Sequence, residues 1–374
     1  MGARVRPRTH SSFERVRYSF PHRTFAVLLT ALTRYKLRKL AKYTLVTVAV
    51  ASAFILYSGG ALDAQLGAWA LLGLWTGVLE EYFFGRRFRA LAIPLQFIGK
   101  VLLVNLLTIA LILLTFAFNS DTFNWFSYDQ PQKVQQLFLM RQLYTLMLRV
   151  VIITSIALLV VQVEEFMGRR LFFGFLFGRY ERPVAEERVV LTLDLVGSTG
   201  LAERMGDLRY FRFINTTYSL MTDAVLRNEA DIHKYVGDEV IFTWPMKVGV
   251  RYENCLDLFF DIEERIAQHA EVLRGEFGMV PAFRAALHGG RVISAQIGHT
   301  KRSVELSGDV MNSVSRMLGV AKDMKVDMLI SSEMLGRLPH AHDRFSIGPE
   351  MVAPVKGRKR EVRVHEIGRF KKGA

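Results

Sequence analysis

Four apolar stretches in the first half of the chain limit its fold more than any other feature. They cover residues 41–58, 66–84, 101–118 and 143–163. Each is about 18–21 residues long, which is enough for a helix to cross a hydrocarbon core of roughly 30 Å. The sequence therefore predicts a four-helix transmembrane domain over residues 41–165. A basic segment, residues 1–40, precedes this domain, and a coupling linker, residues 166–187, follows it.

Basic residues flank these stretches unevenly, and this asymmetry predicts the topology. The formal net charge is +14, while 51% of the residues are hydrophobic. Lysine and arginine cluster before the first stretch, between the second and third, and after the fourth, whereas residues 59–65 contain none. The positive-inside rule therefore places both termini and the C-terminal half in the cytoplasm, at the inner cell membrane. A basic segment also suits nucleic acid, but the apolar stretches that follow favour lipid as the partner and predict no nucleic-acid partner.

A short acidic and basic motif occurs at the ends of the second and fourth stretches. Glu80 and Glu81 precede an arginine pair at 86–87, and Glu164 and Glu165 precede one at 169–170. Either the four glutamates form an acidic ring for ions or signalling, or they make interfacial Glu–Arg pairs within a duplicated sequence. Arg149, inside the fourth stretch, either extends to the outer surface or marks a polar pocket.

The C-terminal half has the pattern of a soluble α+β domain, residues 188–368, with a basic tail at 369–374. We expect strands at 189–195, 231–236, 239–244, 282–288, 291–297, 328–331 and 361–367, with helices near 199–228, 250–276 and 309–322. This order predicts a ferredoxin-like βαββαβ fold, in which helices cover one face of a four-stranded antiparallel sheet. The single cysteine, Cys255, excludes an intramolecular disulfide and suits a buried helix face.

Two carboxylates are expected at the ends of neighbouring strands. Asp194 ends an apolar strand, and Asp238 lies in the tight turn of a hairpin. The turn after Asp194 contains Gly197, Ser198 and Thr199, whose backbone amides suit a phosphate at the start of a helix. Carboxylates beside such a turn predict a metal and phosphate site.

Three motifs at these positions resemble the class III adenylate/guanylate cyclase catalytic domain. They are Leu193-Asp-Leu-Val-Gly-Ser-Thr199, Lys234-Tyr-Val-Gly-Asp-Glu239 and Gly308-Asp-Val-Met-Asn-Ser-Val-Ser-Arg-Met317. The resemblance implies two magnesium or manganese ions per active site, held by Asp194, Asp238 and the backbone of Leu195. It also implies contacts with the nucleotide: Lys234 and Glu305 with the purine, Asn312 with the ribose, Arg316 with the transition-state phosphate, and Lys356 or Arg358 with the phosphates. The last two residues lie in a basic run that equally suits a solvated face.

The resemblance also bears on substrate and assembly. Guanylate cyclases of the family tend to have Glu at the position of Lys234, so Lys234 favours ATP; Glu305 stands where adenylate cyclases more often have Asp or Thr.

Because metal-binding and base-binding residues occur in one chain, the resemblance implies a homodimer with two equivalent sites. The sequence thus predicts a membrane-anchored adenylate cyclase that makes cyclic AMP and pyrophosphate. A guanylate or other nucleotide cyclase and a non-catalytic nucleotide-binding membrane sensor are the alternatives, and the upstream signal stays unidentified.

Overall fold

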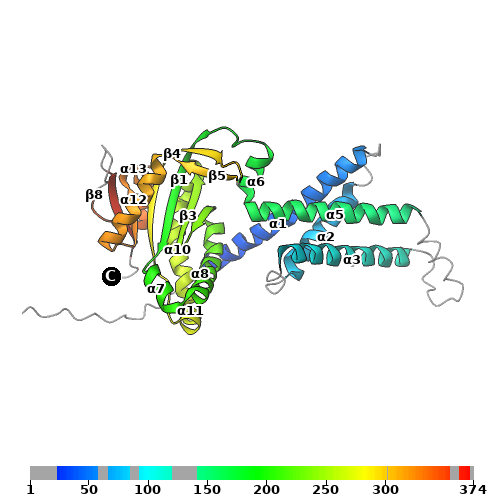
Figure 1. Ribbon diagram of the computed structural model, residues 1–374, viewed down its shortest axis with the longest axis horizontal. Coiled ribbons are helices and arrows are strands. Elements are labelled where there is room, and N and C mark those ends of the chain that lie inside the picture. The colour runs from blue at the N-terminus through cyan, green and yellow to red at the C-terminus, as the bar shows by residue number, and fades with distance from the viewer. Residues whose placement is uncertain are drawn as a thin grey trace, which may run out of the picture.

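The structure is a computed structural model that describes residues 23–57, 66–84, 92–119, 141–300, 302–353 and 362–370. A helical arm and an α/β domain make up the described chain (Figure 1). The arm contains α1 (Arg23–Tyr57), α2 (Leu66–Phe83), α3 (Ile93–Asn119) and α5 (Arg141–Met167). The early part of α1 reaches the α/β domain and lies beside α8 (Asp207–Arg227).

Two of these helices are long and apolar enough to cross a membrane, at Tyr35–Tyr57 and Tyr144–Met167. They include most of the first and fourth predicted spans. The apolar part of α3 described with side chains, Pro94–Ala110, is shorter, and α2 has two glutamates within its 18 residues. The connections predicted to lie outside, residues 59–65 and nearly all of 119–142, are outside the described residues.

Helices α1 and α2 approach closely because α2 presents two glycines one turn apart. A Cβ on Gly73 would lie 2.7 Å from the Thr44 Cα, and one on Gly77 would lie 3.0 Å from a methyl carbon of Leu40. Small residues at this spacing let two helix backbones approach within a membrane. The glycines therefore fix the α1–α2 contact, a feature that the sequence analysis did not include.

The four glutamates of the repeated motif pair with lysines of neighbouring helices. Glu80 of α2 contacts Lys100 of α3 at 2.6 Å, and Glu164 of α5 contacts Lys42 of α1 at 2.7 Å. Lys39 of α1 lies 3.0 Å from Glu165 and 3.7 Å from Glu81, and Lys36 lies 3.4 Å from Glu81. Lysines from other helices thus pair with these acidic side chains. The arginines at 86–87 and 169–170 lie outside the residues described with side chains, so the acidic ring and the Glu–Arg pairs both stay predictions. Arg149 stacks on the ring of Phe54, with 5.5 Å from its guanidinium carbon to the ring centroid.

A short helix, α6 (Arg169–Leu176), leads from the arm to the α/β domain. The ring of Tyr180, which is buried, lies against Gly174. The first strand of the domain, β1 (Val184–Leu195), begins inside the predicted linker and before the predicted strand start at residue 189.

The sheet of the α/β domain has the strand order β2-β3-β1-β4-β6-β9-β7. Its first four strands are β2 (Asp231–Val236), β3 (Glu239–Pro245), β1 and β4 (Phe283–Ile297), all antiparallel. With α8 between β1 and β2, and α10 (Asn254–Gln268) between β3 and β4, they form the predicted ferredoxin-like core. The sheet continues through β6 (Met328–Ser331), parallel to β4, then β9 (Val362–Arg369) and β7 (Phe345–Ile347). Two short strands pair beside it: β5 (Ser303–Ser307) with β4, and β8 (Met351–Ala353) with β9.

Three details of the prediction were wrong. The strands expected at 282–288 and 291–297 are one strand, because Gly289 and Gly290 stay extended and pair with Val189 and Arg188 instead of forming a turn. The helix expected at 199–228 is interrupted at Gly206, which has a φ of 72° and separates α7 (Ser198–Met205) from α8. Helices cover both faces of the sheet, since α12 (Asp309–Met324) lies opposite α8 and α10 (Figure 1).

The alternation of side chains along β1 explains why both faces are covered. Leu191 and Leu193 join the core formed with α8 and α10, which includes the thiol of Cys255. Val190 joins a second core formed with α12. Because successive side chains of a strand point to opposite faces, Asp194 lies on the α12 side, like Val190.

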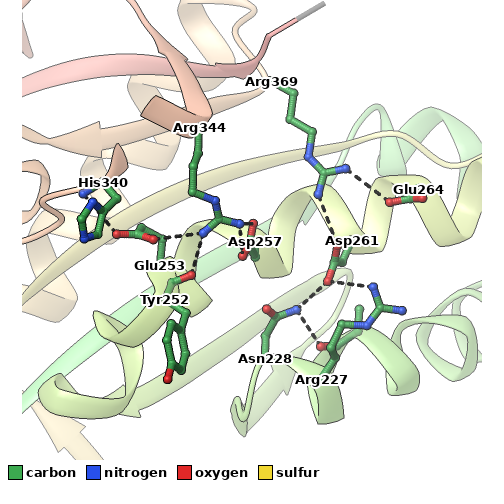
Figure 2. Close-up of polar contacts among 11 residues, drawn as sticks. Arg227, Asn228, Tyr252, Glu253, Asp257, Asp261, Glu264, His340, Arg344 and Arg369 are labelled. Carbon is green, nitrogen blue, oxygen red and sulfur yellow. Dashed lines mark hydrogen bonds and ion pairs between the residues drawn. The ribbon is translucent and has the colours of Figure 1, made fainter. Parts of the chain in front are cut away.

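Two arginines attach the C-terminal elements of the domain to α10 (Figure 2). Arg344 binds Asp257 at 2.6 Å and the buried Glu253 at 3.0 Å, and Arg369 of β9 binds Asp261 at 3.2 Å. Glu253 has a φ of 55°, a left-handed conformation just before α10. This network holds the edge of the sheet that lies farthest from the predicted site.

Candidate active site

The hairpin of β2 and β3 brings the two predicted metal-binding carboxylates together. Val236 pairs with Glu239, which leaves a two-residue turn of Gly237 and Asp238. Gly237 has a φ of 63°, a conformation that glycine adopts without strain. Asp194 of β1 pairs with Glu239 of β3, so the end of β1 lies directly beside the turn. The side chains are close enough for the charge of Asp238 to raise the pKa of Asp194.

The electrostatics of this end of the sheet disfavour three adjacent negative charges. Burial raises the pKa of Asp194, Asp238 raises it further, and the ammonium of Lys322, 2.8 Å away, partly opposes both effects. Burial and the charge of Asp194 likewise raise the pKa of Glu239. A cation bound here would relieve this repulsion.

Two tyrosines of α8 lie beside the turn, and neither belongs to the motifs from which the site was predicted. The hydroxyl of Tyr218 donates a hydrogen bond to the Gly237 carbonyl at 3.3 Å, and its ring stacks on Tyr235 with centroids 4.9 Å apart. Burial and the charge of Asp238 raise the pKa of Tyr210. Only the amphipathic pattern of α8 could have indicated these residues.

The predicted phosphate-binding turn follows Asp194 directly. Gly197 has a left-handed conformation, with a φ of 72°, and precedes α7, which begins at Ser198 and Thr199. Within the described part of the chain, no side chain caps this helix start. Its backbone amides therefore lie a few residues after Asp194, where they can donate to an anion. Leu195, between Asp194 and this turn, has a buried side chain and pairs with Phe283 of β4.

The two residues predicted to contact the purine form an ion pair. The Lys234 Nζ lies 2.5 Å from the Glu305 Oε2, joining β2 to β5. Burial opposes the ionised form of Glu305, but the hydrogen bond and charge of Lys234 outweigh it and lower the pKa of this carboxyl. The neighbouring His233 is buried, and its Nε2 lies 3.8 Å from the Glu305 Oε2. Burial lowers the pKa of His233 to about 4, so its imidazole is neutral at pH 7.

The residues predicted to contact ribose and phosphate lie on α12. Asn312 is exposed and Arg316 is half-buried one turn later, so the two share a helix face. Lys322, near the end of the same helix, is the residue that contacts Asp194. Lys356 and Arg358 lie outside the described residues.

The oxygen donors at the hairpin tip fit magnesium or manganese. Among the described residues no group of three or more His, Cys, Asp or Glu side chains is arranged to hold a metal ion. The predicted ligand set needs only two carboxylates and a backbone carbonyl, which are hard donors that suit these ions. The ammonium of Lys322 at Asp194 shows that this carboxylate already attracts a cation.

Comparison with known proteins agrees with these motifs. Residues 182–367 match the family described as the Adenylate and Guanylate cyclase catalytic domain. The chain is 42% identical over 179 residues to "Adenylate cyclase 2" of Rhizobium meliloti (strain 1021), covering 48% of this chain and 49% of the relative. It is 24% identical over 187 residues to "Adenylate cyclase" of Anabaena cylindrica, covering 48% and 36%. The C-terminal half of the chain therefore belongs to the class III adenylate/guanylate cyclase catalytic domain family.

A solved structure is also similar. The adenylyl cyclase CyaB from P. aeruginosa matches with a TM-score of 0.43 and 19% sequence identity, over 52% of this chain and 99% of that chain. The match to the two curated relatives extends over about half of one and about a third of the other.

Proposed function

We propose that the chain is a membrane-anchored adenylate cyclase that converts ATP to 3′,5′-cyclic AMP and pyrophosphate. The observation that carries this proposal is the meeting of Asp194 and Asp238 at the hairpin tip of a cyclase-family domain. These two side chains, with the Leu195 backbone, would hold the magnesium or manganese ions. Bound metal would acidify the ribose 3′-hydroxyl and neutralise charge on the α-phosphate and the departing pyrophosphate.

The protein groups have separate tasks in this reaction. The 3′-oxygen attacks the α-phosphate, the bond to the pyrophosphate oxygen breaks, and the hydroxyl proton leaves to solvent. Arg316 would donate to the non-bridging oxygens as their charge develops, and Asn312 would orient the ribose. The amides after Gly197 would bind the terminal phosphates.

The ion pair between Lys234 and Glu305 supports ATP as the substrate. Adenine presents an acceptor, N1, beside a donor, its 6-amino group. A lysine and a carboxylate held side by side offer the matching donor and acceptor. Guanine has the opposite order, an N1 hydrogen beside the O6 acceptor, and would leave both protein groups mismatched.

The geometry of α12 supports a homodimer with two shared sites. Asn312 lies ten residues before Lys322, which corresponds to a rise of about 15 Å along a helix, and Lys322 contacts Asp194 of the same chain. The ribose-binding residues thus lie far along the helix from their own metal-binding carboxylates. We infer that each site combines Asp194 and Asp238 of one chain with Lys234, Asn312 and Arg316 of the other.

The helical arm would anchor this dimer in the inner membrane. We propose that all four helices cross the bilayer, with both termini and the catalytic domain in the cytoplasm. The two helices that are long and apolar enough by themselves support this arrangement. The lysine-neutralised glutamates of α2 and α5 support it further, because paired charges are tolerated near a membrane interface.

The decisive experiment is an assay of the full chain in lipid with manganese and either ATP or GTP. We expect cyclic AMP as the main product. Faster turnover of GTP would indicate a guanylate cyclase, and nucleotide binding without turnover would indicate a non-catalytic sensor. The dimer is tested by mixing chains that carry Asp194→Asn with chains that carry Arg316→Ala. Each variant alone should be inactive, whereas the mixture should recover activity because one intact site forms; no recovery would contradict shared sites.

A further inference from the structure

A lysine that has no place in the proposed reaction contacts a carboxylate of the metal site. Lys322 lies near the C-terminal end of α12, and its Nζ is 2.8 Å from the Asp194 Oδ2. The Asp194 side chain is 11% exposed, whereas that of Lys322 is 45% exposed. The lysine thus reaches from the solvent side to a carboxylate within the site.

The surroundings of Asp194 explain why a cation is held there. Asp238 and Glu239 lie on the neighbouring hairpin, and their negative charges act on the same space. Arg284 of β4 pairs with Asp194 in the sheet register and contributes a positive charge from the strand side. Of these two positive charges, the ammonium of Lys322 is the one that can move away, because it is carried on a flexible stem that is 45% exposed.

We propose that Lys322 is an internal counter-ion that occupies Asp194 in the metal-free chain and is displaced when a divalent cation binds. This inference rests on the proposed function, because it takes Asp194 to be a metal ligand. A magnesium or manganese ion contacts a carboxylate oxygen at about 2.0–2.2 Å, and an ammonium on the same carboxylate would be repelled by it. Binding of the metal is thus an exchange of cations, and Lys322 sets the metal concentration that the enzyme requires.

The counter-ion role predicts a change in metal affinity that other roles of Lys322 do not predict. An ammonium that merely packed against the site would leave metal affinity unchanged when it is removed. A lysine whose role is to bind the nucleotide phosphates would leave the affinity for metal without nucleotide unchanged. Competition predicts instead that metal binds more tightly once the lysine charge is gone.

The test measures manganese binding to the full chain in lipid nanodiscs without nucleotide, from the loss of the electron paramagnetic resonance signal of free manganese. Lys322→Gln should lower the manganese Kd by about three- to fivefold, the range expected for a partly exposed ion pair. Lys322→Arg, which keeps the charge, should bind manganese like the unmodified chain. Lys325→Gln is the matched control, since Lys325 is an exposed lysine three residues later for which the described structure gives no ion pair.

Asp194→Asn separates failure of this inference from failure of the proposed function. Loss of manganese binding in Asp194→Asn, with an unchanged or higher Kd in Lys322→Gln, overturns the counter-ion role and leaves the metal site in place. Unchanged binding in Asp194→Asn overturns both. Lys322→Ala repeats the measurement with a smaller side chain. An equal gain in manganese affinity in the Lys325→Gln control would attribute the effect to general surface charge and contradict the proposal.

Discussion

The two halves of the molecule treat their buried carboxylates in opposite ways. In the helical arm, Glu80 and Glu164 each contact a lysine of a neighbouring helix, at 2.6 and 2.7 Å. At the hairpin tip of the catalytic domain, Asp194, Asp238 and Glu239 lie together, and Lys322 is the lysine of the described residues that contacts one of them. Among the described side chains, the first arrangement gives each of these carboxylates its own lysine, while the second places three carboxylates beside Lys322 and Arg284.

This difference indicates what each set of carboxylates does. A matched pair between helices fixes their packing and offers little to a ligand, because its charges already satisfy each other. An unbalanced cluster destabilises the empty domain and is stabilised by a bound cation. We therefore infer that the arm uses its glutamates for assembly, and we propose that the catalytic domain uses its aspartates for binding.

Neutralising a carboxylate of the hairpin tip should produce the largest effect on activity. With Asp194→Asn we expect cyclic AMP formation to fall by more than about a thousandfold, because the proposed function makes Asp194 a metal ligand. The thermal midpoint should stay the same or rise, since burial raises the pKa of Asp194 and ionisation of that carboxyl disfavours the folded domain. Initial rates and a thermal scan of the same preparation measure both. A midpoint that falls together with activity would contradict the comparison and make Asp194 a structural residue.

Removing a carboxylate of the helical arm should have the converse effect on stability. The side chains of Glu80 and Lys100 are 5% and 10% exposed. Glu80→Ala would leave the Lys100 charge buried without its partner, which we expect to lower the free energy of unfolding by about 3–5 kcal/mol. Chemical unfolding of the full chain in detergent measures this change.

Two further variants test whether the pair itself is responsible. Glu81→Ala is the matched control, because Glu81 contacts its lysines only at 3.4 and 3.7 Å and should cost less than about 1 kcal/mol. Adding Lys100→Met to Glu80→Ala should recover most of the loss. If the double variant is as unstable as the single one, helix packing and not charge balance explains Glu80.

Acid should destabilise the catalytic domain through His233, a base with a buried side chain beside the Lys234–Glu305 pair. Burial lowers its pKa to about 4, against an ordinary value of 6.5 in the unfolded chain. Between these values the unfolded chain binds the proton and the folded one does not, so stability is lost as the pH falls from 6.5 to 4. The loss is at most about 3 kcal/mol.

The pH dependence of the thermal midpoint of the catalytic domain tests this assignment. His233→Gln should show a shallower decline over the same pH range, while His340→Gln, at an exposed histidine, should decline like the unmodified chain. Parallel curves for all three proteins would attribute the acid sensitivity to other groups.

Local sequence patterns predicted the hairpin tip, because β-branched strands around a Gly-Asp turn determine it within a few residues. The ferredoxin-like core followed from the order of strands and helices. The prediction failed where distant residues decide the outcome. Gly289 and Gly290 resemble a turn locally, but pairing with β1 keeps them extended. The contacts of Glu80 with Lys100 and of Asp194 with Lys322 join residues whose meeting depends on helix packing, so no local spacing indicates them.

The smallest expected effect concerns the hydrogen bond that positions the turn with Asp238. Tyr218 donates a hydrogen bond to the Gly237 carbonyl at 3.3 Å, and this bond attaches the turn with Asp238 to α8. Tyr218→Phe keeps the stacking on Tyr235 and removes only the hydroxyl, so we expect a stability loss of about 0.5–1.5 kcal/mol. Because the turn then positions Asp238 less well, the maximal rate should fall a few-fold and require more manganese, with the KM for ATP unchanged. Tyr252→Phe is the control, because Tyr252 is exposed and lies near the network of Arg344 and Glu253, away from the turn (Figure 2). A changed KM with an unchanged metal requirement would place Tyr218 in nucleotide binding. It would also contradict the view that a rigid turn positions the aspartates, as the lysines of the arm position its glutamates.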